Sequence, residues 1–329
     1  MKVALMPLKW NSGNDVYFQL LKKWLDKYTK IKSDVFFLPA FLEKVPFLYP
    51  YYLNKFNLKK YDIIHTNAEF WHYFKIKDKK LFVTIHHLIF DEQYQKYTSF
   101  FQKIFHYLWI KPNLKKTLKV ADKVVAVSNF TAKSVKKYFN LKRTINTIYN
   151  GIDTDIFKFE SWLKNKNKPY RLIFIWNQSK RKWRDIVCEV MKKLWKDYQL
   201  YYAWLRNDKT KYLEKYNMYC LWKLSIKQLV QEYNKANALF FPSRLEWFWY
   251  SIAESIACGT PVVTTNYSSM KEIVIDWKNG FLCKMDDMNE FIKKIKEVET
   301  RVFDKDVLRN SILHFDLKNL AKNYEKICT

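Results

Sequence analysis

The chain lacks the features of a disulfide-stabilised, zinc-binding or membrane-spanning protein. Its five cysteines form no CxxC pair and show no tight Cys/His spacing, which argues against a zinc site and fits a reducing compartment. No apolar run reaches about 18 residues, the length that a membrane-spanning helix needs. The opening MKVALMPLKW lacks the long apolar core of a signal peptide. We therefore expect a cytoplasmic protein.

Glycine is scarce, whereas tryptophan is abundant. The chain of 329 residues contains 4 Gly and 13 Trp, although average usage of about 7% would give roughly 23 glycines. This imbalance bears on the expected site, because glycine is the residue that lets backbone and ligand approach closely.

Acidic residues are outnumbered by basic ones, and the net charge is +27. The excess is spread over both halves of the chain, whereas a discrete nucleic-acid module would concentrate it. Such a spread favours anionic partners in general: phosphorylated substrates, an anionic membrane surface or nucleic acid. A lysine-rich composition of the source proteome explains it equally well.

Short β-rich runs alternate with amphipathic stretches along the whole chain, which predicts an α/β protein with doubly wound sheets. The expected strands are 3–6, 35–38, 62–65, 81–86, 123–128, 145–149, 171–175, 200–205, 238–241 and 261–264. The clearest helical patterns are 15–28, 131–139, 185–196 and 225–235. The polar stretch Phe157–Pro169 separates two strand series, so we expect two Rossmann-like domains facing a cleft.

The most informative segment is Phe240–Leu282. It contains Pro242-Ser243, then Glu246 and Glu254 with seven residues between them, then ACGTPVV, EIV and NGFL. This order resembles the retaining GT-B glycosyltransferases of the family 4 type. The resemblance implies an N-terminal acceptor-side domain (1–160), a C-terminal nucleotide-sugar domain (161–311) and a last helix (312–329) that crosses back to the first domain.

Two glutamates and a helix start carry the expected donor site. By resemblance, Glu246 lies near the transferred sugar and acts in catalysis, while Glu254 holds the ribose. Free backbone N–H groups at a helix start favour a phosphate, and a carboxylate suits vicinal hydroxyls. The expected donor-binding residues of this turn are Trp247, Phe248, Trp249, Tyr250 and Ser251.

The segment RLIFIWNQSKRKW (171–183) resembles the strand and loop that open the family's second domain. There Lys182 matches a lysine that contacts the donor pyrophosphate, where a fixed cation stabilises the leaving group. Asn177 stands where the family has arginine, so Arg181 is expected to supply that charge. The resemblance implies no metal and no cofactor, since the nucleotide-sugar is a substrate.

The first domain offers weaker signals. His86, at the end of a predicted strand, aligns with a family histidine near the donor sugar or acceptor and is a second catalytic candidate. The loop Lys9–Asp15, which includes Trp10, is expected to line the cleft. Gly151 in the segment IYNGIDTDIF is expected to adopt a positive φ. The aromatic segment Phe41–Phe56 is either packed on the domain or a membrane-surface and lipid-acceptor element.

Several tryptophans stand where the family has glycine. They are Trp176, Trp183, Trp222, Trp247, Trp249 and Trp277, with Trp10 and Trp204 as further cases. Tryptophan is the largest substitute possible, and independent replacement at so many sites is improbable. Our hypothesis is that the source reads UGA as glycine and that the sequence was translated with UGA as tryptophan. The alternative is a degenerate, inactive paralogue with genuine tryptophans.

The expected function is transfer of a sugar, with retention, from a nucleotide-sugar donor to a glycan or lipid-linked acceptor hydroxyl. Cell-envelope glycan or glycolipid synthesis is the family's usual setting, and peripheral contact with the inner face of the membrane fits the charge. A basic membrane- or nucleic-acid-binding protein and a nucleotide-sugar epimerase are the alternatives. We expect no specific nucleic-acid partner.

Overall fold

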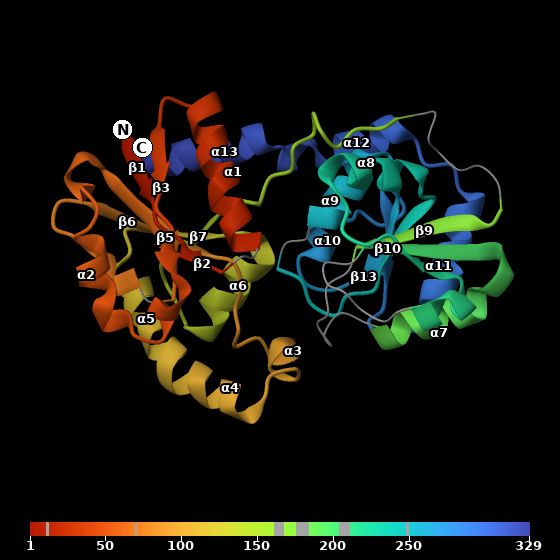
Figure 1. The fold of residues 1–329 in the computed structure, drawn as a ribbon, viewed down its shortest axis with the longest axis horizontal. Coiled ribbons are helices and arrows are strands. Elements are labelled where there is room, and N and C mark those ends of the chain that lie inside the picture. The colour runs from red at the N-terminus through yellow and green to blue at the C-terminus, as the bar shows by residue number, and fades with distance from the viewer. Residues whose placement is uncertain (11–12, 70, 161–167, 176–183, 204–210, 248–249) are drawn as a thin grey trace. The chain divides into compact units, whose positions relative to one another are not determined.

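The computed structural model describes residues 1–10, 13–69, 71–160, 168–175, 184–203, 211–247 and 250–329. The chain forms two compact units. Unit 1 comprises Met1–Gly151 and Leu317–Thr329, and unit 2 comprises Ile152–Asp316. The last helix therefore belongs to the unit that contains the N-terminus (Figure 1). No helix among the described residues is long and apolar enough to cross a bilayer.

Unit 1 is built on a six-stranded sheet with parallel pairing throughout and the order β3-β1-β5-β6-β7-β8. Its strands are β1 (Lys2–Leu5), β3 (Lys32–Val35), β5 (Ile63–Asn67), β6 (Lys80–Ile85), β7 (Lys123–Ala126) and β8 (Asn146–Thr147). A separate pair consists of β2 (Leu8–Lys9) and β4 (Leu38–Pro39).

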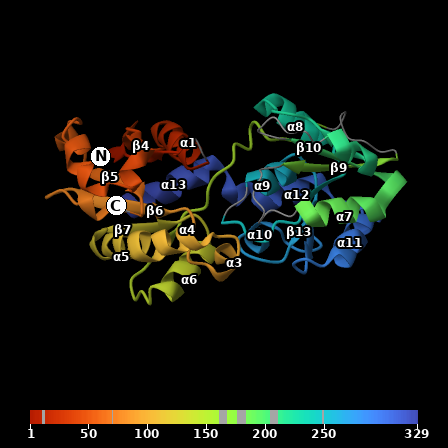
Figure 2. The ribbon, with the colours of Figure 1, turned by 60° about the horizontal axis from the view of Figure 1, so that its bottom comes forward.

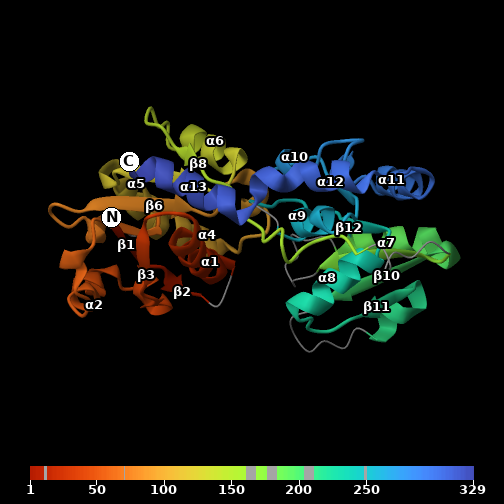
Figure 3. The same cartoon turned by 90° about the horizontal axis from the view of Figure 1, so that it is seen from above.

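The longer helices of unit 1 cover both faces of this sheet (Figures 1 and 2). They are α1 (Gly13–Tyr28), α5 (Lys111–Val120), α6 (Asn129–Tyr138) and α13 (Leu317–Cys328). Shorter elements are η1 (Ala40–Glu43), η2 (Pro46–Leu48), α2 (Tyr49–Leu53), η3 (Leu58–Lys60), η4 (Trp71–Phe74), α3 (Glu92–Gln95), α4 (Phe100–Phe105) and η5 (His106–Ile110). Figure 3 shows α13 running alongside the sheet of unit 1.

The core of unit 1 is closed by the two ends of the chain. Helix α1 buries Tyr17, Phe18, Leu21 and Leu25, a spacing that places one apolar stripe against the sheet. Helix α13 adds its own buried stripe to the same cluster, including Leu317 and Tyr324 in the core, so both chain ends stabilise one core.

Unit 2 also contains a six-stranded sheet with parallel pairing throughout, but its strand order, β11-β10-β9-β12-β13-β14, differs from that of unit 1. Its strands are β9 (Tyr170–Ile175), β10 (Tyr198–Ala203), β11 (Met218–Cys220), β12 (Ala238–Phe241), β13 (Val262–Thr265) and β14 (Gly280–Cys283). Strand β12, ALFF, is buried at every position, as expected for a strand covered on both faces.

Figure 1 shows helices on both faces of the unit 2 sheet. The helical elements are α7 (Arg184–Leu194), η8 (Trp195–Asp197), η9 (Lys211–Tyr216), α8 (Ile226–Lys235), α9 (Tyr250–Ala257), α10 (Met270–Ile273), α11 (Met288–Thr300), α12 (Lys305–Ile312) and η10 (Leu313–Phe315). Local sequence sets their starts: Ser225 and Gln228 form a capping box at α8, and the Asp287 side chain caps α11.

The fold class predicted from the sequence is confirmed, and several details needed correction. The strand expected at 35–38 is wrong: β3 ends at Val35, because its register pairs Lys32–Val35 with Lys2–Leu5 of β1. Strands β11 and β14 were not predicted. Most of the predicted linker, 161–167, lies outside the described residues.

Gly151 is needed for a different reason from the one predicted. Its φ is not in the positive range, which among the described glycines only Gly259 adopts, with φ 72. A Cβ at Gly151 would instead lie 2.6 Å from Cδ2 and 2.9 Å from Cα of Leu317. Close approach of the last helix therefore excludes a side chain at this position.

Candidate active site

The topology of unit 2 marks one point of its sheet as the natural ligand site. From β9 the chain continues to β10 and β11 on one side, and then returns to place β12, β13 and β14 on the other. Strands β9 and β12 are therefore neighbours at a switch point, with Leu172 opposite Ala238. Ligands of doubly wound folds bind at the carboxyl ends of such strands. The segments that follow them in the chain are 176–183 and 242–249, which carry the two donor-site motifs.

Glu246 is held firmly in the loop after β12. Its residue is 3% exposed, and its Oε1 accepts a 2.6 Å hydrogen bond from the hydroxyl of Ser243. Its backbone N–H donates to Ser268 Oγ at 3.0 Å, and its carbonyl accepts from Ser269 Oγ at 2.9 Å. Three serines thus fix the residue through both backbone and side chain, which preorganises the carboxylate.

Glu254 lies in α9, between the switch point and the adjacent helix α8. Its carboxylate accepts a 3.0 Å hydrogen bond from the hydroxyl of Tyr233, which is fully buried in α8. Burial raises the pKa of Glu254 to about 7, although the bond from Tyr233 opposes the shift. A half-buried carboxyl group with a pKa near neutrality can accept hydrogen bonds from a ligand when it is ionised and donate one when it is protonated.

Arg244 connects the loop after β12 to the start of α7 and to the turn after β14. The sequence did not single out this residue. Its Nη2 lies 2.6 Å from Asp185 Oδ2, and its Nε lies 2.6 Å from Asp286 Oδ1. Burial disfavours ionised Asp185, but the hydrogen bond and charge of Arg244 prevail and lower its pKa. Asp185 stands in the first turn of α7, which begins directly after residues 176–183 in the sequence. The guanidinium group therefore fixes the position of the helix that follows the predicted phosphate loop.

Several predicted donor residues lie outside the described residues, namely Arg181, Lys182, Phe248 and Trp249. Of the other predicted residues near α9, Trp247 is 8% exposed and Ser251 is buried. Tyr250 is the first residue of α9. The helix start expected to bind phosphate is thus four residues after Glu246.

His86 follows β6 of unit 1 and packs against α1. Its ring meets that of Tyr17 edge-on, with centroids 4.8 Å apart. Burial, with smaller contributions from His87 and His65, lowers its pKa to about 3, so the imidazole is neutral at pH 7. Its Nε2 is buried and has no hydrogen-bond partner among the described residues. Trp10 is 42% exposed, and its backbone N–H donates to Asp15 Oδ1 at 3.2 Å.

Unit 1 also contains titratable groups that sequence reasoning missed. Glu69 follows β5, and burial raises its pKa to about 7. Burial and the charge of Glu69 raise the pKa of Glu43 to about 7 as well. His65 inside β5 contacts Thr84 Oγ1 at 2.7 Å and the hydroxyl of Tyr324 at 2.9 Å. Their sequence context resembles ordinary strand and loop residues, so no local signal marked them.

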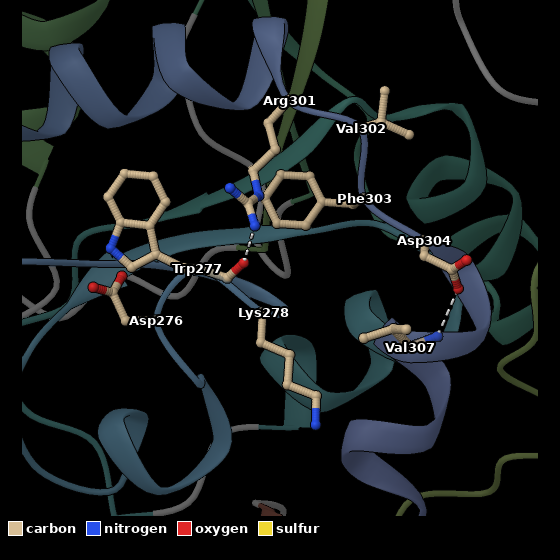
Figure 4. Close-up of a pocket in the computed structure, with 8 residues that line it drawn as sticks. All are labelled: Asp276, Trp277, Lys278, Arg301, Val302, Phe303, Asp304 and Val307. Atoms are coloured by element: carbon tan, nitrogen blue, oxygen red, sulfur yellow. Dashed lines mark hydrogen bonds between the residues drawn. The ribbon is translucent and has the colours of Figure 1, made fainter.

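A surface pocket of about 410 Å³ lies elsewhere in unit 2 (Figure 4). It is lined by the turn before β14 and by the connection between α11 and α12, with Trp277 and Phe303 among its walls. Arg301 donates a 2.8 Å hydrogen bond to the carbonyl of Trp277 across it. Because this turn precedes β14, the pocket is at the amino end of that strand, whereas ligands bind at the carboxyl ends.

Two family models match the chain in succession. Glycosyltransferase Family 4 matches residues 13–156, and Glycosyl transferases group 1 matches residues 155–306. This chain belongs to the GT-B glycosyltransferases of the family 4 type. The family places it among hexosyltransferase-type enzymes, EC 2.4.

Individual relatives agree with this family. The chain is 28% identical over 187 residues to the uncharacterized glycosyltransferase MJ1178 of Methanocaldococcus jannaschii, covering 54% of this chain and 50% of that protein. It is 25% identical to the O-antigen chain mannosyltransferase RfbU of Salmonella typhimurium, covering 75% of this chain and 73% of that protein. The matched segment thus spans half of the archaeal relative and about three quarters of the Salmonella one.

A solved structure shares the GT-B fold. Anabaena Alr3699/HepE, in complex with UDP and glucose, aligns with a TM-score of 0.74 and 16% identity, covering 100% of this chain and 99% of that chain. At this identity the comparison establishes the fold. The fold and the family models together account for both units of the chain.

Proposed function

We propose that this protein transfers a sugar, with retention at the anomeric carbon, from a nucleoside diphosphate sugar to an acceptor hydroxyl. The observation that carries the proposal is the serine-fixed Glu246 at the β9/β12 switch point, four residues before α9. The anomeric C–O bond to the diphosphate breaks, and a bond to the acceptor oxygen forms. The acceptor proton leaves with the departing phosphate oxygen or with solvent.

Unit 2 is the proposed donor-binding unit. The start of α9 and the cations Arg181 and Lys182 stabilise the negative charge on the leaving diphosphate, without a metal ion. Glu246 lies beside the transferred sugar, and Glu254 accepts hydrogen bonds from the ribose hydroxyls. Binding of UDP by a protein of the same fold supports this division of roles.

Unit 1 is the proposed acceptor-binding unit. The imidazole of His86 is neutral at pH 7 because its pKa is lowered to about 3, so it serves as a hydrogen-bonding group beside the donor sugar or acceptor. The Salmonella relative acts on the O-antigen chain, which supports a cell-envelope glycan or its lipid-linked precursor as acceptor. We place the reaction in the cytoplasm, where nucleotide-sugars are made.

A thermal-shift screen against UDP-, GDP- and ADP-sugars tests the donor assignment, because a ligand of the native state raises its melting temperature. The screen uses the chain as written and Trp247→Gly/Trp249→Gly, whose smaller side chains leave room for a sugar. One donor class should raise the melting temperature, and Glu254→Gln should reduce that shift while Glu189→Gln, on the exposed side of α7, should not. Absence of a shift with every sugar-nucleotide in both proteins would contradict the proposal.

A further inference from the structure

Helix α4 of unit 1 has an unusual composition for an outer helix. Its sequence is FFQKIF, and none of its six residues is buried. The exposed fractions are 71% for Phe100, 81% for Phe101, 40% for Ile104 and 74% for Leu108 of the following η5. Monomeric proteins rarely expose contiguous large apolar side chains unless they bind something there. We call these four residues the α4 surface.

The α4 surface belongs to a helical run that is anchored in the core of unit 1. Elements α4, η5 and α5 form one continuous helical run from Phe100 to Val120. The inner side of α5 is anchored in the core through Leu114 and Leu118. In Figure 1, α4 lies at the lower edge of the unit, beyond α5. The apolar side chains are therefore presented by a fixed helix.

A second aromatic segment adjoins this run. The indole N–H of Trp109 donates a 3.1 Å hydrogen bond to the carbonyl of Glu43 in η1. That segment exposes Phe41, Phe47 and Tyr51 by 48%, 66% and 63% while it buries Tyr49. The sequence left open whether residues 41–56 are packed on the domain or face a membrane, and the structure shows both buried and exposed aromatic side chains in this segment.

The charged residues of the stretch that carries the α4 surface have a single sign. Residues 96–120 contain no aspartate or glutamate and six lysines, which are Lys96, Lys103, Lys111, Lys115, Lys116 and Lys119. Basic residues beside exposed Phe and Leu on a helix fit the boundary between lipid headgroups and acyl chains. Near an anionic surface each lysine adds to the attraction, which salt screens.

We propose that the α4 surface binds an anionic lipid bilayer, with its apolar side chains inserted at the headgroup boundary and the lysines against the headgroups. The proposal is independent of the donor chemistry. It fits an enzyme whose acceptor is lipid-linked, because the acceptor then diffuses in the plane to which unit 1 is attached.

Vesicle sedimentation with the full chain tests this proposal. We expect binding to phosphatidylglycerol/phosphatidylcholine vesicles, little binding to pure phosphatidylcholine, and loss of binding at about 1 M salt. Phe100→Ser/Phe101→Ser/Leu108→Ser should weaken binding at least tenfold, and Val302→Ser, at a 94% exposed site in unit 2, should leave it unchanged. Lys103→Glu/Lys115→Glu should weaken binding similarly, whereas Lys227→Glu/Lys293→Glu should have a smaller effect.

Two outcomes would overturn it. In the first, vesicle binding does not depend on the α4 surface: the unmodified chain does not bind anionic vesicles, or the triple serine variant binds them equally well. In the second, light scattering shows that the unmodified chain is a dimer and the triple variant a monomer, which assigns the surface to a second copy of the chain. Melting curves establish that each variant is folded. We expect all of them to fold, because every substituted side chain is exposed.

A different observation carries a second inference. Among the described residues, three tryptophans have φ in the left-handed range: Trp195 (41°), Trp222 (56°) and Trp277 (66°). Glycine adopts this range readily, and for a bulky residue it is a genuine outlier. Each of the three side chains is about half exposed, and the ring of Trp277 contacts Phe281 and Lys294.

The local structure at these positions is of the kind that glycine normally serves. Trp195 directly follows the last residue of α7, where a left-handed glycine commonly ends a helix. Trp222 stands between β11 and the capping box of α8. Trp277 is in a tight turn, and its N–H donates to the carbonyl of Gly280 at 2.9 Å.

Other tryptophans have environments that suit an indole. Trp24 lies within α1, is 3% exposed and stacks on Tyr28 at 4.9 Å between ring centroids. Trp109 uses its indole N–H in the bond to Glu43. The structure thus separates tryptophans with a left-handed backbone from Trp24 and Trp109, whose backbone is right-handed and helical. Composition alone does not make this distinction among the 13 tryptophans.

We propose that the natural protein carries glycine at positions 195, 222 and 277, where the printed sequence has tryptophan. Trp195 had not been suspected from the sequence. The pocket of Figure 4, which the Trp277 side chain lines, would then lose one of its walls. Reading of UGA as glycine in the source explains all three positions together with the scarcity of glycine.

Mass spectrometry of the protein isolated from its source decides the question. Peptides that contain positions 195, 222 and 277 should each be lighter by the mass difference between tryptophan and glycine, while the peptide with Trp24 keeps its indole. In protein made from the printed sequence, Trp195→Gly, Trp222→Gly and Trp277→Gly should each raise the melting temperature by about 2–6 °C. Trp24→Gly should lower it by about 10 °C. Indole-bearing peptides at the three positions, or lower melting temperatures of their glycine variants, would overturn the inference.

Discussion

Both units are built on a six-stranded parallel sheet, yet the groups near their strand ends differ in kind. In unit 2, the loop after β12 is fixed by hydroxyl groups around Glu246 and by the ion pairs of Arg244 with Asp185 and Asp286. In unit 1, burial lowers the pKa of His65 and His86 to about 3, so both imidazoles are neutral at pH 7, and raises the pKa of Glu69 to about 7.

This difference is the one that the proposed division into a donor-binding unit 2 and an acceptor-binding unit 1 requires. A site for a diphosphate needs fixed cations and hydrogen-bond donors that are already in place. A site for an uncharged sugar acceptor is better served by neutral polar groups among aromatic rings, because unpaired charges are costly to bury. The predictions below test whether the chemistry of the two units is separable.

The largest expected effect is on catalysis through unit 2. Glu246→Gln keeps the size of the side chain and an oxygen that can accept from Ser243, but it removes the negative charge. We expect kcat for sugar transfer to fall by about 10²–10³-fold with little change in melting temperature. Glu189→Gln, in exposed surroundings on α7, is the control. Unchanged activity of the Glu246→Gln enzyme would contradict a catalytic role for Glu246.

The next effect concerns stability in unit 1. Gly151→Ala places a methyl group 2.6 Å from Leu317 Cδ2 and 2.9 Å from its backbone Cα, so α13 must shift. We expect a loss of about 1–3 kcal/mol of unfolding free energy, measured by denaturant titration. Donor affinity should remain unchanged, because α13 belongs to unit 1. Lys158→Ala, at an exposed position seven residues later, provides the comparison.

A smaller effect is expected from Arg244. Arg244→Met keeps the length of the side chain and removes its bonds to Asp185 and Asp286. Both aspartates are more than half exposed, so the stability loss should be only about 1–2 kcal/mol. The KM for the donor should rise by about tenfold, since the start of α7 loses the bonds that fix its position.

Arg244→Lys sharpens this test. A lysine retains the charge but cannot bond both aspartates in the same planar geometry. It should therefore behave more like Met than like Arg in donor affinity. Full rescue by lysine would mean that charge alone matters at this position.

The smallest effect is a pH dependence in unit 1. His65 is fully buried with its pKa lowered to about 3, whereas the unfolded residue has a pKa near 6.5. The unfolded state therefore binds the extra proton, so His65 costs no stability above about pH 6.5 and progressively more as pH falls toward 3. Between pH 7 and 5 the cost is about 1–2 kcal/mol.

His65→Gln should flatten this part of the stability curve, even if it lowers stability at neutral pH. Thermal melts of both proteins from pH 7 to pH 5 measure the difference in slope. Equal slopes would show that His65 is not neutral in the folded state.

The sequence by itself determined the alternation of strands and helices, the parallel class of the sheets and the motif around Glu246 and Glu254. These features are local: apolar runs, caps and short spacings are readable within a window of a few residues. Even the strand Ala238–Phe241 was located to the residue, because every one of its side chains is apolar.

Only the tertiary structure decided the contacts between distant residues. Arg244 meets Asp185 and Asp286 from 59 and 42 positions away, Gly151 is constrained by Leu317, and Trp195 has a left-handed backbone. The neighbouring residues do not encode the contacts of Arg244 and Gly151, because these contacts depend on which segments the fold brings together. Close packing then turns that order into specific demands on single residues, including positions where only glycine fits without strain.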